Sequence, residues 1–200
     1  MVTVTNKLLI IIILTLGFQS LSKADDIKDF EIEGISIGDS LLDYFTEDKI
    51  KSSVQLTQYP SSDKYIILTF NDLPKFEIYD SIQIDYKKND KKYIVASIMG
   101  TLAFPNNIDA CYKKQKTITD EVTLVFPDAE KFNGKQKKAF DKTGQSTSYL
   151  YEFHLLTGDV VQISCDDWSE EMTNKHTLKD HLGVSIMSYD FVYFLYNEAY

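Results

Sequence analysis

The chain has no arginine: all 21 of its basic residues are lysines, set against 30 acidic residues. Arginine makes most of the bidentate contacts that recognise phosphate and guanine. An acidic chain without it is a poor candidate for nucleic acid or anionic lipid, and we predict no nucleic-acid partner. A genome that favours AT-rich codons would also produce a chain without arginine, and we give this explanation the larger weight. It is compatible with the absence of a nucleic-acid partner.

Cysteine is also scarce, with only Cys111 and Cys165 in 200 residues. Two cysteines in an exported protein most simply pair with each other. Because the two are far apart in sequence, the chain-entropy model gives their disulfide an upper value of about 4 kcal/mol of stabilisation. The alternative is a free catalytic cysteine, but no histidine lies near either one in sequence.

Histidine is limited to His154, His176 and His181. The last two are five positions apart, which places them on different faces of a helix, and with both cysteines paired no compact set of metal ligands remains. The acidic stretch around Trp168 lacks the glycine spacing of a calcium loop. No glycine-rich phosphate loop occurs either, so we predict no metal site and no cofactor.

Long apolar runs are confined to residues 8–16. Lys7 precedes this run, and Ser22, Lys23 and Ala24 follow it in the pattern that signal peptidase cleaves. The run is too short for a typical transmembrane helix, and no cysteine follows it, which excludes the lipoprotein route. We therefore predict a signal peptide at 1–24, cleaved after Ala24, and no later membrane span in an exported, periplasmic or secreted chain.

The mature chain, 25–200, alternates extended and helical patterns and is long enough for one domain. Strands are predicted at 65–70, 76–86 and 93–104, with a lysine-rich hairpin turn at 87–92. A helix is predicted at 106–126, because an asparagine can cap its start, Pro127 ends it, and apolar residues recur along one face at positions 108, 111, 112, 118, 122 and 125.

The second half gives a similar succession. The strands at 147–156 and 160–165 form the clearest hairpin, around the turn Thr157-Gly158-Asp159. Helices are predicted at 178–182 and 188–198, residues 129–140 remain unassigned, and Trp168 is expected in the core beside a solvated acidic loop. The fold class is α+β, with antiparallel sheets and packed helices, and 25–105 and 106–200 are two candidate halves in tandem.

Gly38-Asp39-Ser40-Leu41 resembles the first block of the GDSL-type lipases and esterases. The resemblance implies a nucleophilic Ser40 assisted by a histidine near the C-terminus, for which His181 is the candidate. The other blocks depart from the family, because no histidine has an aspartate three positions before it. A helix N-cap also favours Asp39 and Ser40 at this place. We therefore expect no enzyme and keep the serine esterase as the alternative function.

Aromatic residues crowd the C-terminal region from Tyr189 to Tyr200. Core packing accounts for most of them, and an exposed remainder would form a protein-binding patch. We take Trp168, Tyr193 and Tyr196 as the candidate interaction surface.

The string from Ile32 to Phe45, IEGISIGDSLLDYF, and the string from Cys165 to Ser169, CDDWS, together resemble a group of short exported proteins of AT-rich marine bacteria. The likeness covers most of the mature chain. This group carries no assigned activity, so the resemblance implies a compartment, the periplasm or envelope of a Gram-negative cell. The expected function is that of a binding module for a protein, an envelope component or a small ligand.

Overall fold

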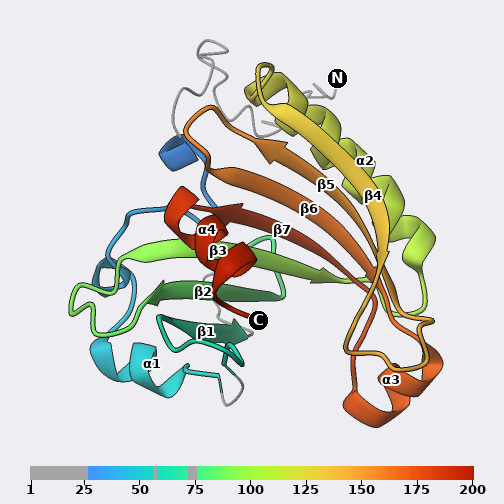
Figure 1. The fold of residues 1–200 in the computed structure, drawn as a ribbon, viewed down its shortest axis with the longest axis horizontal. Coiled ribbons are helices and arrows are strands. Elements are labelled where there is room, and N and C mark those ends of the chain that lie inside the picture. The colour runs from blue at the N-terminus through green and yellow to red at the C-terminus, as the bar shows by residue number, and fades with distance from the viewer. Residues whose placement is uncertain (1–26, 56–57, 72–75) are drawn as a thin grey trace, which may run out of the picture.

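The computed structural model describes residues 27–55, 58–71 and 76–200, so the predicted signal peptide at 1–24 lies outside the described residues. Within the described residues, one antiparallel sheet of seven strands has the order β1-β2-β3-β7-β6-β5-β4 (Figure 1). The strands are β1 Tyr65–Asn71, β2 Ser81–Lys87, β3 Val95–Ala103, β4 Glu130–Lys137, β5 Thr147–His154, β6 Val160–Asp167 and β7 His181–Met187. The α-helices are α1 Glu47–Ser52, α2 Ile108–Val125, α3 Glu170–His176 and α4 Tyr189–Asn197, and short 3-10 turns η1 Ile27–Asp29 and η2 Leu41–Asp43 precede them.

The α+β class with an antiparallel sheet and packed helices is confirmed. The chain lays down β1, β2 and β3 as neighbours, crosses through α2 to the opposite edge, and returns through β4, β5 and β6 to β7, which pairs with β3. The segments 25–105 and 106–200 thus contribute to one continuous sheet. No helix among the described residues is long and apolar enough to cross a membrane.

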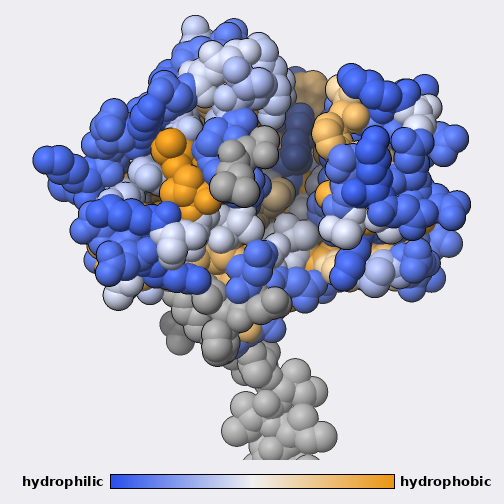
Figure 2. All heavy atoms as spheres, turned by 90° about the horizontal axis from the view of Figure 1, so that it is seen from below, coloured by the Kyte–Doolittle hydropathy of each residue, from blue (hydrophilic) through white to orange (hydrophobic). Residues whose placement is uncertain are grey.

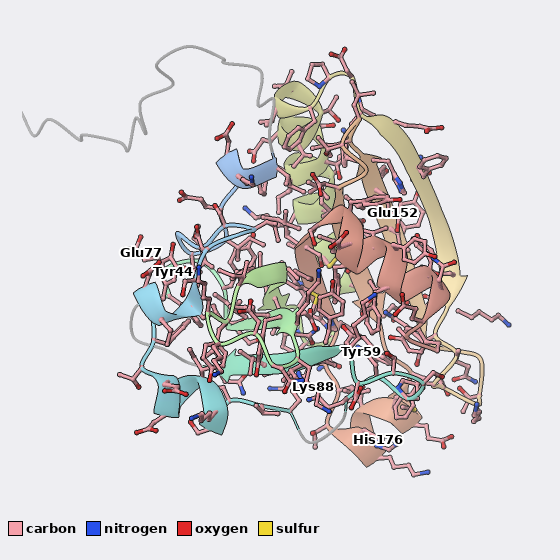
Figure 3. All side chains as sticks on the ribbon, turned by 60° about the vertical axis from the view of Figure 1, so that its left-hand side comes forward. Tyr44, Tyr59, Glu77, Lys88, Glu152 and His176 are labelled. Atoms are coloured by element: carbon pink, nitrogen blue, oxygen red, sulfur yellow. A yellow bond between two sulfur atoms is a disulfide. The ribbon has the colours of Figure 1, made fainter. Side chains whose placement is uncertain are left out.

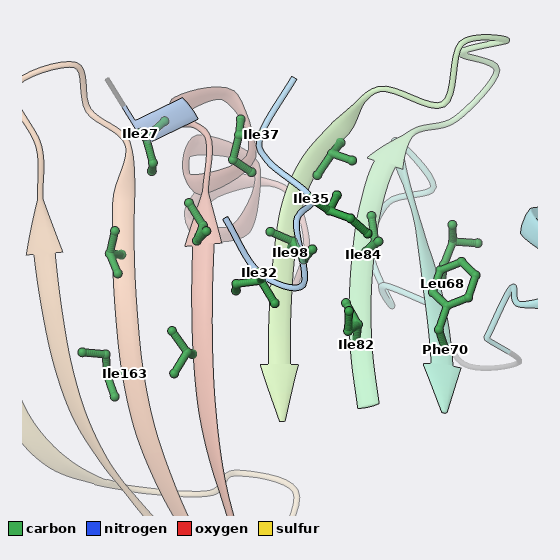
Figure 4. Close-up of a cluster of buried hydrophobic side chains, with 14 of the residues drawn as sticks. Ile27, Ile32, Ile35, Ile37, Leu68, Phe70, Ile82, Ile84, Ile98 and Ile163 are labelled. Carbon is green, nitrogen blue, oxygen red and sulfur yellow. The ribbon is translucent and has the colours of Figure 1, made fainter. Parts of the chain in front are cut away.

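Each strand presents alternate side chains to two faces, which we name the α2 face and the α4 face after the helices that cover them. The α2 face carries an aliphatic layer that includes Ile82, Ile98 and Ile163 (Figure 4). Helix α2 and the N-terminal segment 27–45 cover it, and Ile32 and Ile35 of that segment are fully buried against the strands. This face holds the main core.

Two polar or covalent links fasten α2 to the sheet. Cys111 of α2 and Cys165 of β6 form the predicted disulfide, with a Cα–Cα distance of 6.0 Å. One turn along the helix, the buried Gln115 donates from Nε2 to the carbonyl oxygens of Tyr149 and Ile163, at 2.7 and 2.9 Å. The helix begins at an asparagine cap one residue later than predicted, because Asn107 and not Asn106 accepts from the backbone N–H of Ala110.

The α4 face has a smaller apolar cluster at one end of the sheet. Tyr65, Val160 and Met187 pack there against Phe191 and Phe194, the inward residues of α4. The predicted helix at 188–198 is therefore correct in position.

Two predictions are wrong, and one unassigned segment is settled. Residues 178–182 do not form a helix: β7 begins at His181, and its residues from Leu182 to Met187 are buried on both faces, which removes the alternation that marks a strand. The acidic loop after Trp168 instead contains α3, whose N-cap Ser169 accepts from the N–H of Met172. Within 129–140 lies the edge strand β4.

Candidate functional site

Small and polar residues occupy the middle of the α4 face. Ser97, Ser164, Gly183 and Ser185 point to this face from three adjacent strands, and Gln162 lies beside them. Because these side chains fill little volume, the apolar cluster under α4 does not extend across the sheet. Hollows remain at both ends, and we name them the α4 groove and the α3 cleft.

The α4 groove lies between α4 and the strands β4, β5 and β6. Its main cavity has a volume of about 500 Å³, and a second hollow of about 310 Å³ shares its residues Gln136, Glu152 and Tyr196. The two hollows are therefore neighbours. Apolar walls come from Val160, Met187, Val192 and Leu195, with Tyr200 at the C-terminal end.

Exposed aromatic rings border this groove. Because Phe191 and Phe194 take the inward positions of α4, Tyr193 and Tyr196 fall on its outer side, where they are 51% and 71% exposed. Desolvation on the groove side, and then the negative charge of Glu152, raise the pKa of the Tyr196 hydroxyl above its ordinary value. The groove therefore has an aromatic rim around a partly polar floor.

The polar floor is held by hydrogen bonds centred on Glu152 of β5. Gln162 donates from Nε2 to Glu152 Oε1 at 2.7 Å, and His154 Nε2 lies 3.2 Å from Oε2. The His154 ring also meets Phe132 of β4 edge to face, with centroids 5.0 Å apart. Figure 3 shows Glu152 beside α4 and His176, on α3, toward the opposite end of the sheet.

The α3 cleft, of about 710 Å³, lies at that opposite end. Its lining includes Ser81 and Thr101 from strands and Trp168, Lys179 and His181 from the region around α3. Figure 2 views this end of the molecule and shows a hollow between its two sides, bordered by both hydrophilic and hydrophobic atoms.

Trp168 and His181 are fixed by contacts on the cleft wall. Their rings are stacked with centroids 6.5 Å apart, and Lys138 Nζ lies 5.5 Å from the indole centroid. His181 Nδ1 lies 2.9 Å from the carbonyl oxygen of Lys179 and must carry the hydrogen, since a carbonyl only accepts. Its Nε2 lies 3.3 Å from Asp166, whose buried carboxylate also pairs with Lys138 at 2.6 Å.

The candidate interaction surface divides between the two hollows. Trp168 lines the α3 cleft, whereas Tyr193 and Tyr196 belong to α4. Strand β6 separates them, since Val160 lies under α4 and Asp167 directly precedes Trp168. At about 3.3 Å per residue, this strand is roughly 20 Å long, so the three rings do not form one patch.

Ser40 and His181 are not brought together. Ser40 Oγ donates to the carbonyl oxygen of Lys92 at 2.7 Å and accepts from the N–H of Leu42 at the start of η2, as a cap does. Ser40 forms a bridge with Ile94, while His181 pairs with Ala103 at the far end of β3. Along an extended strand these positions are roughly 30 Å apart.

The rest of the GDSL-like motif also has structural roles. Gly38 adopts a φ of 92°, which favours glycine. Asp39 Oδ2 accepts from the hydroxyl of Tyr44 at 2.6 Å and from the N–H of Ser36 at 2.9 Å. The hydrogen bond to Asp39, and after it burial, raise the pKa of the Tyr44 hydroxyl to about 12.

Sequence reasoning missed Asp85, a fully buried carboxyl on the α4 face. Burial raises its pKa to about 7, although hydrogen bonds from Tyr59, Ser97 and Gln83 oppose the shift. The Tyr59 hydroxyl donates to Asp85 Oδ1 at 2.9 Å. A polar residue in an alternating strand usually faces solvent, so the pattern gave no signal of this burial.

No group of three histidine, cysteine or acidic side chains in the described part of the chain is placed to hold a metal ion. Comparisons of the chain with protein-family models, curated proteins and solved structures find no match. Function must therefore be inferred from the two hollows of the α4 face.

Proposed function

We propose that this protein is an exported interaction module that binds an extended, acidic segment of a partner protein in the α4 groove. The observation that carries this proposal is the set of exposed rings that line the groove and its second hollow: Tyr196, Tyr200 and Phe132 are between 47% and 82% exposed. Tyrosine is enriched at protein interfaces, where its ring supplies contact area and its hydroxyl a hydrogen bond.

The neighbouring edge of the sheet supports an extended partner. Among the described residues, strand β4 pairs only with β5, and all residues of β4 are exposed. An unpaired strand edge can accept another strand through main-chain hydrogen bonds, with side chains entering pockets on one face. The groove and its second hollow, which Phe132 and Gly134 of β4 line, offer such pockets.

The charge of this edge supports an acidic partner. Lys131, Lys135 and Lys137 lie along β4 at register positions that face the α2 side of this edge, and none of them forms an ion pair with another described residue. Lysines on an edge strand also oppose self-association of the sheet, which leaves the edge available to a partner of opposite charge.

Export and a non-catalytic role complete the proposal. A disulfide between Cys111 and Cys165 persists in an oxidising compartment such as the periplasm. The two hydrogen bonds of Ser40 Oγ at the start of η2 support a structural role for this residue. The alternative function is that of a serine esterase that uses Ser40. Hydrolysis of p-nitrophenyl esters that Ser40→Ala abolishes would establish the alternative.

The test uses the mature protein and a displayed library of short random peptides. We expect enrichment of acidic peptides, and at least about tenfold weaker binding of them by Tyr196→Ser, measured by fluorescence polarisation. Leu124→Ser is the matched control, because Leu124 is 70% exposed on α2, away from the groove. Equal loss in both variants, or no loss in Tyr196→Ser, would overturn the assignment of the groove.

A further inference from the structure

The α3 cleft is lined by side chains with mixed hydrogen-bonding roles. Asn71 has an amide that both donates and accepts, and the hydroxyls of Ser81 and Thr101 do the same. Within residues 27–55, 58–71 and 76–200, these three side chains have no hydrogen-bond partner. Their polar atoms are therefore available to a ligand.

The indole of Trp168 supplies an apolar surface in a fixed position. Its backbone N–H donates to Asp180 Oδ1 at 2.9 Å, and the ring is stacked on His181. Its Nε1 is buried and has no hydrogen-bond partner among the described residues. An unpaired buried donor is unfavourable, and a ligand oxygen that approaches the edge of the ring would satisfy it after a small shift.

The charges around the cleft disfavour an ionic ligand. Asp80, held by a 2.8 Å bond from the N–H of Ala103, would repel an anion. Lys179 and His181, which line the same cleft, would repel a metal ion or another cation when charged. A neutral molecule with many hydroxyl groups meets neither penalty, because each hydroxyl can accept from Lys179 or donate to Asp80.

We propose that the α3 cleft binds a neutral saccharide, with hydroxyls bonded to Asn71, Ser81 and Thr101 and an apolar C–H face against Trp168. The cleft volume of about 710 Å³ is within the range of about 300–1,000 Å³ typical of small-molecule sites. This inference is independent of the proposed peptide groove, because the two sites occupy opposite ends of the α4 face.

The experiment uses the fluorescence of Trp168, the only tryptophan of the chain. The mature protein is titrated with a panel of neutral mono- and disaccharides that includes maltose, cellobiose and N,N′-diacetylchitobiose. Gluconate and inorganic phosphate test for an anion site instead, and glycerol controls for solvent effects. We expect a saturable change in emission with at least one neutral sugar, at a Kd below about 1 mM.

Two variants at one position separate binding from folding. Thr101→Val removes the hydroxyl with little change of shape, and we expect about tenfold weaker binding of the sugar. Thr101→Ser keeps the hydroxyl and should bind within about threefold of the natural protein. Both retain Trp168 as the probe, and circular dichroism checks that both are folded.

The outcomes distinguish this proposal from the first one. A flat titration with every neutral sugar, saturation by phosphate or gluconate alone, or equal affinity in Thr101→Val and Thr101→Ser would overturn the saccharide site. Loss of peptide binding in Tyr196→Ser with unchanged sugar binding would show that the peptide and the sugar bind at separate sites. A sugar response that Tyr196→Ser abolishes in a folded protein would contradict its placement at α3.

Discussion

The two faces of the sheet come from the same strands but are built differently. The α2 face carries the main apolar core, is covered by α2 and the segment 27–45, and is joined to α2 by a disulfide. The α4 face has its apolar cluster under α4, and much of its remaining area holds small or polar side chains and two hollows. An antiparallel sheet can thus use one face for stability and leave the other to make contacts.

Breaking the covalent link of the α2 face should have the largest effect on stability. The disulfide spans a sequence separation of 54, so its reduction should lower the free energy of unfolding by about 4 kcal/mol at most. Urea unfolding with and without reductant measures this loss. A Cys111→Ala/Cys165→Ala variant should be insensitive to reductant, and an unchanged midpoint in the natural protein would mean that packing alone fixes α2.

The buried carboxyl of the α4 face should make stability depend on pH. The pKa of Asp85 is 3.8 in its ordinary state and about 7 in the folded protein. Between pH 3.8 and pH 7, the folded protein therefore keeps a proton on Asp85 that the unfolded chain has lost. Its contribution is therefore most favourable below pH 3.8 and is lost as the pH rises through 7. Asp85→Asn cannot ionise, and should be more stable than the natural protein at pH 8 by up to about 4 kcal/mol.

Urea unfolding of both proteins from pH 4 to pH 8 isolates this effect from other titrating groups. The advantage of Asp85→Asn should grow with pH and level off above about 7. A constant difference between the two proteins would show that Asp85 does not titrate as its burial indicates.

Removing the polar link of the α2 face should have a smaller effect. Gln115→Met keeps the side-chain length but leaves the carbonyl oxygens of Tyr149 and Ile163 without this donor. We expect a loss of about 1–3 kcal/mol in the free energy of unfolding. Lys114→Met, at the exposed neighbouring position of α2, is the control and should change it by less than about 0.5 kcal/mol. Equal effects of the two substitutions would show that the hydrogen bonds of Gln115 do not help to hold α2 on the sheet.

The smallest effect is expected on the exposed side of α4. Tyr193 is half exposed, so Tyr193→Ser should change the free energy of unfolding by less than about 0.5 kcal/mol. Urea unfolding tests this expectation. A loss above 1.5 kcal/mol, about half of a typical core truncation, would show that the ring stabilises α4 and would weaken the case for a binding surface.

Elements with local signals were predictable from the sequence. The β5–β6 hairpin, the α2 helix with its asparagine cap and the stripe of α4 each depend on residues that are close in the chain. Strand β7 was not, because both of its faces are buried and no alternation remains. Helix α3 has only seven residues, too few for a helical stripe to stand out.

The candidate sites show the same limit. The aromatic rings were identified individually, but nothing in the sequence indicated that Trp168 lies apart from Tyr193 and Tyr196. Glu152 and Gln162 were not identified, because isolated polar residues in strands give no sign of which ones share a hollow. Their shared position depends on strand register, which is set by pairing over the whole sheet.

The sequence by itself determined the fold class, the hairpins, the main helix and the pairing of its only two cysteines, because these follow from local patterns and from composition. Only the tertiary structure decided that β7 joins the two parts of the sheet, that Ser40 and His181 lie apart, and that the α4 face has a hollow at each end. The physical reason is that a hollow forms where side chains from distant strands fail to fill the space, and that space is defined by the assembled sheet.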